Sequence, residues 1–458
     1  MPREIYHDDS SWERYPKYWN EKIETMPLKE LKRLQEKKLR AQIEYVYSKS
    51  RFYHELFRKN NLYPSDIKTI EDLQKIPFTD KEDLRKSQEE SPLGLHACVP
   101  LSNVIRIHAS SGTTGRPTIV GLTRHDVEVF KDAVARFCYS AMVRPGDIVI
   151  HAMALTVFVG GLPFKDAIEE IGAVFVPIGT GPGTSERVVN FTKWLKANVI
   201  HCTPSFATYL GEYVKKRYNI EPRELGIRKI IGGAEPGFGI PSVRRAIEEE
   251  WQADAREGLG NADMLPIIFG ECFYKTGMHF LVPDYVVVEL IDPDTGENVE
   301  ITEGATGELV YTAIDRECCP LIRFRTGDRV IVWTEQCECG RTGFRVRCIG
   351  RTDDMLKVSG VKVFPSAIKD IIASLRPKTT GALQILLTEP PPRVTPPLKI
   401  QVEYGEGVED LATLKQEIEE ELRAKLYISA DVELVPPGTL PRYEMKAQLI
   451  KRLYEEKH

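Results

Sequence analysis

The chain has 458 residues, of which 42% are hydrophobic and 28% charged, and its formal net charge is −5. This composition is typical of a soluble globular protein and, at roughly 150 residues per domain, predicts about three structural units. It excludes disordered, collagen-like and membrane-embedded chains. Acidic residues slightly outnumber basic ones and no long basic run occurs, so we do not expect nucleic acid as a partner.

The sequence begins MPREIYHDDSSWERYPKYWNEK, which lacks the apolar segment and small-residue cleavage site of a signal peptide. The most apolar stretch, residues 148–164, is too short for a membrane span and is interrupted by polar and glycine residues. We interpret it as a buried strand followed by a pocket-lining loop. Nine unevenly spaced cysteines do not form the pattern of a disulfide framework. These features favour a cytoplasmic protein that does not associate with membranes.

In chain order, residues 28–60 first show the spacing of amphipathic helices with a charged outer face. Strand-like and helix-like runs then alternate. The strand-like runs are NVIRIHA, DIVIHA, AVFVPI, NVIHC and RKIIGG, and the helix-like runs are DVEVFKDAVARF, SERVVNFTKWLKA, PSFATYLGEYVKKR and PSVRRAIEEEW. This alternation predicts βαβ units and a largely parallel sheet.

After about residue 280 the sequence becomes rich in strands and turns, with DPDTG as a hairpin signal between alternating runs. Beyond Gly350, KIQVEY and DVELV read as strands, EDLATLKQEIEEELRAKL as a helix and PPPRVTPP as a surface loop. The predicted fold is therefore α/β. A large N-terminal domain, residues 1–350, combines parallel-rich sheets with a β-rich subdomain, and a small α+β C-terminal domain covers residues 351–458.

The most informative segment runs from His108 to Thr118, HASSGTTGRPT, after a strand-like run. Its small and hydroxyl residues let the backbone approach an anion and offer N–H and hydroxyl groups to phosphate oxygens. The spacing of a P-loop, G-x-x-x-x-G-K-[ST], is absent. By itself, such a segment is more often a plain surface loop.

Other motifs place this loop in a known context. Along the chain follow IPFTDKEDLR (76–85), SSGTTGRPT (110–118), CTPSFATYL (202–210), GGAEPG (232–237), PLIRFRTGD (320–328), IGRTDDMLKVSGVKVFPSAI (349–368) and PGTLPRYEMKAQ (437–448). In this order they closely resemble the phenylacetate–coenzyme A ligase branch of the adenylate-forming enzymes. The resemblance implies that a carboxylate, here an aromatic acid, attacks the α-phosphate of Mg·ATP to give an acyl-adenylate, and that coenzyme A then displaces AMP.

The resemblance also implies residue roles, which suit the need to stabilise a transferring phosphate. The triphosphate would be held by Ser110, Ser111, Gly112, Thr113, Thr114 and Gly115, with Arg116 where many relatives carry Lys. The adenine would contact Gly233, Ala234, Glu235 and Pro236, and the ribose Asp328, with Arg351 nearby. Lys446 would be the adenylation lysine, and Asp353 would lie at the hinge of a mobile C-terminal domain whose other face, with Lys357 and Gly360, forms the thiol tunnel.

Two departures from the family pattern concern magnesium and the acid. Relatives commonly have Tyr-Gly-Leu-Ser/Thr-Glu where this chain has Glu257-Gly-Leu-Gly-Asn261, so either Asn261 or Asp263 is the expected Mg²⁺ ligand. In the predicted acyl pocket, Phe158 and a glycine pair match the family, Met153 stands where an aromatic residue is usual, and Gly232 lies at the wall. An apolar pocket of this kind favours an aryl or arylacetic acid.

Four residues predict a structural zinc site. Cys272-x₆-His279 and Cys337-x-Cys339-Gly supply three sulfurs and one imidazole, a common zinc ligand set. Some members of the resembled family carry the same elements. Cys318, Cys319 and Cys348 lie close enough in the sequence to replace one ligand, whereas Cys98, Cys138 and Cys202 are expected in the core.

The sequence leaves two alternative functions open. The chain could adenylate an acid and pass the acyl or nucleotidyl group to an amine, a carrier protein or another cofactor. The change to Asn261 instead suits a non-catalytic nucleotide binder. His108, His151 and His201 are interpreted as core residues, with the last two as alternative neighbours of the acyl pocket. A homodimer is a mild expectation for a soluble enzyme.

Overall fold

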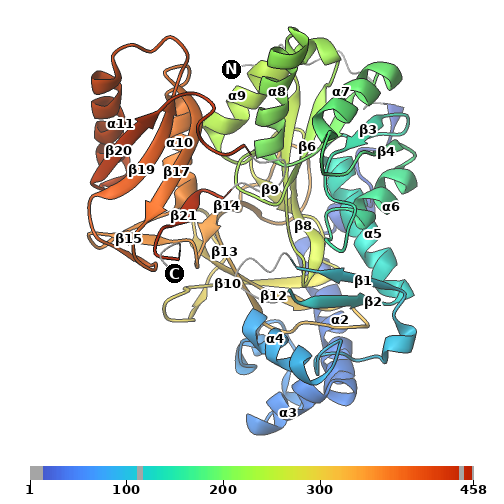
Figure 1. Cartoon of the computed structure of the whole chain (residues 1–458). Helices are drawn as coiled ribbons and strands as arrows, with labels where there is room; N and C mark the ends of the chain where they lie inside the picture. Colours follow the sequence, from blue (N-terminus) through green and yellow to red (C-terminus); the bar gives the residue numbers. More distant parts are fainter. Residues whose placement is uncertain (1–13, 111–116, 443–447, 456–458) are drawn as a thin grey trace.

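The computed structural model describes residues 14–110, 117–442 and 448–455 (Figure 1). Four helices precede the first strand: α1 (Glu21–Glu24), α2 (Leu28–Lys49), α3 (Arg51–Lys59) and α4 (Lys81–Glu90). In α2 the buried residues Leu31, Leu39, Ile43 and Val46 form one stripe, as the helical spacing predicts. Gln35 Nε2 and Gln42 Nε2 donate to the carbonyls of Pro283 and Arg316 at 2.9 and 3.0 Å, which fastens this helix to the large sheet.

One half of the twelve-stranded sheet is parallel. Its strands are, in order, β4 (Val174–Pro177), β3 (Ile148–His151), β5 (Val199–His201), β6 (Lys229–Gly233) and β7 (Asp254–Asn261). The helices of this half are α5 (Arg124–Ser140), α6 (Leu162–Ile171), α7 (Thr184–Leu195), α8 (Pro204–Tyr218) and α9 (Pro241–Trp251). The predicted alternation is confirmed for these elements. Because the strands are parallel, the loops after β3, β5 and β6 meet at one edge, where ligands bind in such sheets.

The other half of the sheet is antiparallel from β7 onward, as the strand-rich sequence predicts. Its strands, in sheet order, are β8 (Leu265–Glu271), β9 (Met278–Phe280), β14 (Arg345–Arg351), β13 (Phe324–Trp333), β12 (Thr306–Ala313), β10 (Val286–Ile291) and β11 (Asn298–Val299). β10 and β11 pair antiparallel across the DPDTG turn. The predicted hairpin is therefore confirmed.

One local prediction was wrong, and two were right only in part. The run NVIRIHA does not join the parallel sheet: β1 (Arg106–Ala109) pairs antiparallel with β2 (Ile119–Leu122) in a small separate sheet. The connection between them is shorter than the dozen or so residues that a parallel crossover needs. The apolar stretch 148–164 ends in a helix, because α6 begins at Leu162. The segment PPPRVTPP contains the short strand β18 (Arg393–Val394).

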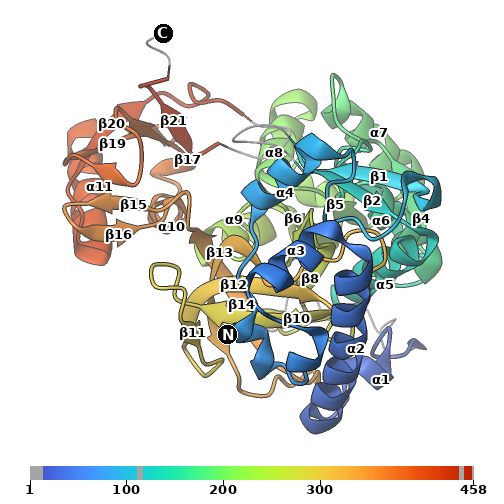
Figure 2. The same cartoon turned by 90° about the horizontal axis from the view of Figure 1, so that it is seen from below.

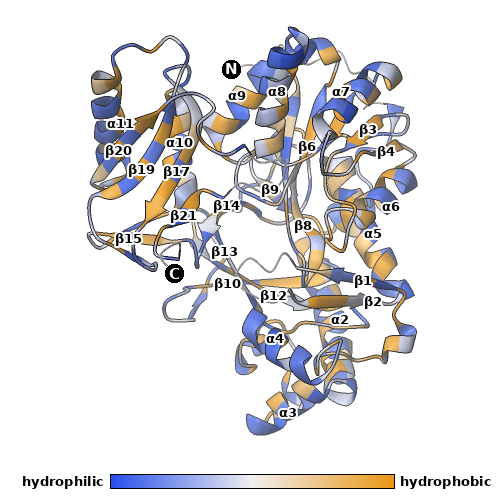
Figure 3. Cartoon of the chain, in the orientation of Figure 1, coloured by the Kyte–Doolittle hydropathy of each residue, from blue (hydrophilic) through white to orange (hydrophobic). Residues whose placement is uncertain are grey.

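The C-terminal part is a separate α+β domain with its own core (Figures 1 and 2). A four-stranded sheet has the order β20 (Ala430–Val435), β19 (Leu398–Tyr404), β17 (Thr379–Leu387) and β21 (Ile450–Arg452), and β15 (Leu356–Val358) pairs with β16 (Val361–Val363) and β18. The helices are α10 (Pro365–Ser374) and α11 (Leu411–Leu426). In α11, Leu414, Ile418 and Leu422 are buried, and hydrophilic residues occupy its other face (Figure 3).

Helix α10 packs against α9 of the N-terminal part, so the C-terminal domain lies beside the parallel half of the large sheet (Figure 1). No helix in the described part of the chain combines the length and the apolarity that a bilayer crossing requires. The nine cysteines, all within the described ranges, are free. Cys98, Cys138 and Cys202 are buried, which confirms their prediction as core residues.

Candidate active site

The two ends of the predicted phosphate loop are fastened to each other. Ser110 follows the strand β1 and Thr118 precedes β2. The Ser110 amide donates to the Thr118 carbonyl at 3.0 Å, the Thr118 amide donates to Ser110 Oγ at 3.1 Å, and the Ser110 hydroxyl donates to Thr118 Oγ1 at 2.8 Å. The loop between them, Ser111, Gly112, Thr113, Thr114, Gly115 and Arg116, lies outside the described residues. Both hydroxyls are buried at the base of the loop.

A carboxylate lies against this base. Asp263, only 4% exposed, accepts a short hydrogen bond from Thr118 Oγ1 through Oδ1, and its Oδ2 lies 3.4 Å from Lys81 Nζ at the start of α4. The other expected metal ligand is engaged locally, because Asn261 Oδ1 accepts the Asp263 amide at 2.9 Å. Asp263 thus contacts Thr118, the described C-terminal end of the phosphate loop.

The Gly232–Pro236 motif begins in the last two residues of β6, at the edge where the parallel strands end. Its glycines permit close approach of the neighbouring strands. A Cβ at Gly232 would lie 1.8 Å from the Cys202 carbonyl oxygen, and one at Gly233 would lie 2.2 Å from that of Gly258. Glu235 then turns back and accepts the backbone N–H of Ser205, in the first turn of α8, at 2.8 Å. Ala234, with φ +71°, makes this sharp turn possible.

Glu257 lies directly across from Gly232 in the sheet and is 7% exposed. Burial and the neighbouring carboxylate of Glu271 raise the pKa of Glu257 to about 7. Glu271 itself forms a two-pronged ion pair with Arg244, at 2.6 and 2.7 Å, and accepts the Glu257 amide at 2.8 Å. Glu257 therefore carries a carboxyl group that is partly protonated near neutral pH.

Asp328 and Arg351 are paired residues of β13 and β14. Arg351 Nη1 donates to Asp328 Oδ1 at 3.1 Å, while its Nε donates to Asp353 Oδ1 at 2.8 Å. The Arg351 guanidinium thus contacts both Asp328, the predicted ribose acceptor, and Asp353, at the predicted hinge. Asp328 is mostly buried, with 8% exposure.

The loop after β3 carries the predicted acyl-pocket residues Met153 and Phe158, both partly buried. It is attached to β1 through the Val157 carbonyl, which accepts the Ala109 amide at 2.8 Å and lies 2.9 Å from His108 Nδ1. This attachment brings the acyl loop and the phosphate loop to the same place. Gly161 is required there, because a Cβ would lie 2.6 Å from the Ala154 carbonyl oxygen.

His151 and His201 form a buried pair, with their Nδ1 atoms 2.9 Å apart at the ends of β3 and β5. His201 stacks on Phe164. Burial lowers the pKa of His151 to about 3, and the pKa of His201 also lies well below its ordinary value because of burial. Both imidazoles are therefore neutral, in keeping with core residues.

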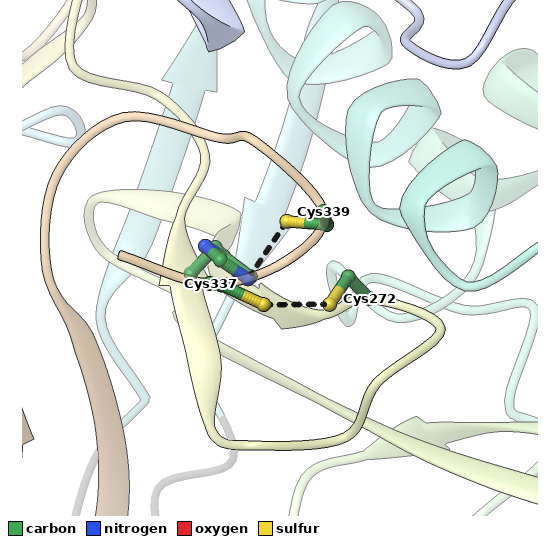
Figure 4. A group of neighbouring side chains, drawn as sticks. Cys272, Cys337 and Cys339 are labelled. Atoms are coloured by element: carbon green, nitrogen blue, oxygen red, sulfur yellow. Dashed lines mark hydrogen bonds between the residues drawn. The ribbon is translucent and has the colours of Figure 1, made fainter. Parts of the chain in front are cut away.

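The four predicted zinc ligands converge in one buried cluster (Figure 4). Cys272 follows β8, His279 lies in β9, and Cys337 and Cys339 lie between β13 and β14. All four ligand atoms lie within 4.8 Å of one another. Cys272 Sγ and Cys337 Sγ are 3.8 Å apart, and Cys339 Sγ is 3.4 Å from His279 Nε2. Cys318, Cys319 and Cys348 are not part of this cluster.

Two predicted residues of the C-terminal domain are not gathered at these loops. Lys357 and Gly360 belong to the hairpin of β15 and β16 (Figure 2), and Lys362 of this hairpin forms an ion pair with Asp294 in the turn between β10 and β11. Lys446 lies outside the described residues. Sequence reasoning missed Lys81, although it belongs to the quoted IPFTDKEDLR motif, and also missed Lys369 of α10, whose Nζ donates to the Pro236 carbonyl at 3.1 Å.

The fold and this edge, with a phosphate-type loop, a glycine-rich motif and an acidic strand end, define an adenylate-forming enzyme. Residues 360–453 match the family described as AMP-binding enzyme C-terminal domain. The chain is 35% identical over 439 residues to the phenylacetate-coenzyme A ligase of Thermus thermophilus, covering 92% of this chain and 96% of that one. The chain belongs to the phenylacetate-coenzyme A ligase family.

A solved structure also resembles the whole chain. The 2-hydroxyisobutyryl-CoA ligase in the postadenylation state, in complex with an acyl-AMP, matches with a TM-score of 0.90 and 29% identity over 96% of this chain and 94% of that one. The same ligase in the thioesterification state, with CoA, matches with a TM-score of 0.71 and 30% identity over 95% and 92%. At nearly equal coverage and identity, this chain is therefore more similar to the postadenylation structure of that ligase than to its thioesterification structure.

Proposed function

We propose that the protein is an AMP-forming ligase that joins an aromatic carboxylic acid, of the aryl or arylacetic class, to coenzyme A. The observation that carries this proposal is the 35% identity to a phenylacetate-coenzyme A ligase over nearly the full length of both chains. The convergence of the phosphate loop, the Gly232–Pro236 motif and the acyl loop at one edge supports it.

The reaction proceeds in two steps. A carboxylate oxygen attacks the α-phosphorus of ATP, the bond from that phosphorus to the bridging oxygen breaks, and pyrophosphate leaves with the electron pair. The acid thereby gains AMP as a good leaving group. The thiol sulfur of coenzyme A then attacks the acyl carbon, loses its proton, and AMP departs. Negative charge accumulates at phosphorus in the first step, so donors and cations must already be in position.

The described residues suit these steps. Ser110 and Thr118 hold the ends of the phosphate loop, whose backbone and hydroxyl groups would bind the triphosphate, and Arg116 would add a fork of donors. Asp328 would accept the ribose hydroxyls, with Arg351 fixing its carboxylate. Lys446 would neutralise the carboxylate and α-phosphate in the first step.

Magnesium would be held by Asp263 in preference to Asn261. The Asp263 carboxylate lies against the base of the phosphate loop and carries a negative charge, whereas Asn261 offers only a neutral carbonyl oxygen. When bound, a divalent cation would neutralise the phosphate oxygens during adenylation. Hard oxygen ligands of this kind fit Mg²⁺. A carboxylate at this position also argues for catalysis over a non-catalytic nucleotide binder.

Zinc would occupy the Cys272, His279, Cys337 and Cys339 cluster. Zn–S bonds of about 2.3 Å in a tetrahedral site place sulfurs roughly 3.8 Å apart, and Cys272 and Cys337 have that separation. The site would have a structural role, since all four ligands come from the protein. The Cys339 carbonyl accepts the Tyr18 hydroxyl at 2.7 Å, so the ion would also stabilise the N-terminal segment. Nine free thiols suit the reducing cytoplasm.

The C-terminal domain would begin near residue 351 and rotate between the two steps. Its separate core starts at Leu356, and Asp353 is exposed beside Arg351 at the junction. After rotation the hairpin with Lys357 and Gly360 would face the acyl-adenylate. The two TM-scores, obtained against one ligase in two states, support such a change of arrangement.

The acid and the first step are tested together by exchange of labelled pyrophosphate into ATP. We expect exchange that depends on phenylacetate or a related aromatic acid and that is much weaker with 2-hydroxyisobutyrate. Lys446→Ala should lower the exchange rate by about 10²-fold or more, as loss of a charge that stabilises the transition state does. Exchange with 2-hydroxyisobutyrate alone would contradict the proposed acid class.

A further inference from the structure

One arginine close to Lys446 in the sequence contacts both domains. Arg442 precedes Lys446 by four positions. Its Nη1 and Nη2 donate to the two carboxylate oxygens of Glu403 at 2.9 and 2.7 Å, and Glu403 is fully buried in the C-terminal domain. Its remaining edge, Nε, donates to Glu212 of α8 at 3.0 Å. Arg442 therefore links the start of this loop to the N-terminal domain.

A second contact joins α10 to the start of α9. The residue before α9, Ile240, provides no side-chain cap for the helix. Asp370 of α10 supplies one from the other domain, because its Oδ1 accepts the Ser242 amide at 3.2 Å and the Ser242 hydroxyl at 2.5 Å. A carboxylate is favoured at this end, where unpaired backbone N–H groups give the helix a partial positive charge.

The neighbouring residue reaches the nucleotide motif. Lys369 precedes Asp370 in α10, and its Nζ donates to the Pro236 carbonyl at 3.1 Å. Burial lowers the pKa of Lys369, and the nearby Glu235 carboxylate opposes that shift. Three contacts, Asp370–Ser242, Lys369–Pro236 and Arg442–Glu212, thus join the C-terminal domain to the segment from α8 to α9.

We infer that the Arg442–Glu212 and Asp370–Ser242 contacts form a latch that holds the C-terminal domain in the arrangement of this structure, the one used for adenylation. This inference rests on the proposed function and deepens it. The chain matches the postadenylation structure of the 2-hydroxyisobutyryl-CoA ligase with a TM-score of 0.90 and the thioesterification structure of the same ligase with 0.71. This difference at nearly equal coverage supports a latch that acts in one of two domain arrangements. Glu212, Ser242 and Asp370 are positioning residues, since they act through the placement of the domain.

Loss of such a latch slows adenylation more than thioester formation, whereas loss of a merely structural residue slows both steps alike. Losing the latch lowers the population of the arrangement in which Lys446 reaches the acid and ATP, so adenylation slows. The second step uses the other arrangement and does not need the latch. Charged hydrogen bonds of this type are about twice as strong as neutral ones.

The test compares Glu212→Gln and Asp370→Ala with a matched control, Glu417→Gln. Glu417 pairs with Lys378 at 2.7 Å on the surface of the C-terminal domain. Alanine favours helices, so α10 should remain intact. Two rates are measured: pyrophosphate exchange into ATP, and thioester formation from chemically prepared phenylacetyl-adenylate and coenzyme A. We expect the ratio of the first rate to the second to fall about tenfold in each latch variant and to stay unchanged in the control.

Hydrogen exchange of the free, full-length protein gives a second readout. In Asp370→Ala, the first turn of α9 should exchange faster while the strands β17 and β19 keep their protection. An unchanged ratio of the two rates, an equal fall of both, or unchanged exchange in α9 would overturn the latch. A wild-type protein that performs neither step would contradict the proposed function instead, and the exchange of α9 would still decide on the latch.

Discussion

Glu257 provides a prediction whose size follows from the structure. Its carboxyl group is 7% exposed, faces the carboxylate of Glu271, and has a pKa of about 7, against 4.5 for an ordinary glutamate. Between these two values the folded protein keeps a proton that the unfolded chain releases. The free energy of unfolding therefore falls as the pH rises through this range, and levels off above about pH 7.

The full penalty is about 3 kcal/mol, since each pKa unit corresponds to about 1.4 kcal/mol. Roughly 1.4 kcal/mol of it is already present at about pH 5.5, which leaves about 2 kcal/mol between about pH 5.5 and pH 8.5. Glu257→Gln removes the ionisation, and its amide oxygen can still accept the Gly239 N–H that contacts the carboxylate. Relative to wild type, this variant should gain about 2 kcal/mol over that pH interval.

Equilibrium urea unfolding, followed by tryptophan fluorescence, gives the free energy of unfolding of both proteins at the two pH values. The change in this free energy between the two pH values is then compared between wild type and Glu257→Gln. Effects of other titrating groups cancel between wild type and variant. Glu417→Gln, which removes a surface carboxylate, should show a difference near zero. A pH-independent difference between wild type and Glu257→Gln would refute the raised pKa, and a relative loss of stability at high pH would refute its sign.

Three further changes test the proposed metals and the glycine-rich motif. Cys337→Ser should abolish bound zinc and lower the free energy of unfolding by about 3 kcal/mol or more, whereas Cys348→Ser should keep the ion. Elemental analysis and thermal unfolding measure these effects, and a wild-type protein without zinc would contradict the proposed metal site. Asp263→Asn should raise the Mg²⁺ concentration needed for half-maximal pyrophosphate exchange about tenfold; a larger effect of Asn261→Ala would reverse the assignment. Gly232→Ala should lower the free energy of unfolding by at least about 3 kcal/mol, because the new Cβ would lie 1.8 Å from the Cys202 carbonyl oxygen. The control Gly226→Ala should lower it by only about 1 kcal/mol, because its Cβ has no atom within 4 Å and only the φ of +78° is unfavourable. Equal urea midpoints for these two glycine variants would refute the steric argument.

The parallel strands and their helices could be predicted because each short apolar run is followed by a helical pattern, and local periodicity reports such elements directly. The antiparallel pairing of β1 and β2 was missed for a related reason. Periodicity identifies a strand but does not say which partner it takes, and only the length of the intervening connection excludes a parallel crossover.

The residues of the candidate site were likewise predictable only in part. Motif residues such as Gly233 and Asp328 could be identified from their order in the chain. The contacts of Asp263 with Lys81, of Arg442 with Glu212 and of Asp370 with Ser242 join residues far apart in the sequence. No local pattern encodes such pairs, since they arise only when the domains have packed. The zinc cluster is intermediate, because the four ligands were predicted together, but only the resemblance linked the two pairs that lie far apart in the sequence.

The central claim is tested most directly by the stoichiometry of a single reaction mixture. Protein, Mg·ATP, phenylacetate and coenzyme A are incubated together, and AMP, pyrophosphate and acyl-CoA are quantified by chromatography and mass spectrometry, with a parallel mixture lacking coenzyme A. The account predicts equal amounts of all three products, and little AMP without the thiol. AMP formation that does not depend on coenzyme A, or ATP binding with no pyrophosphate from any aromatic acid, would contradict it.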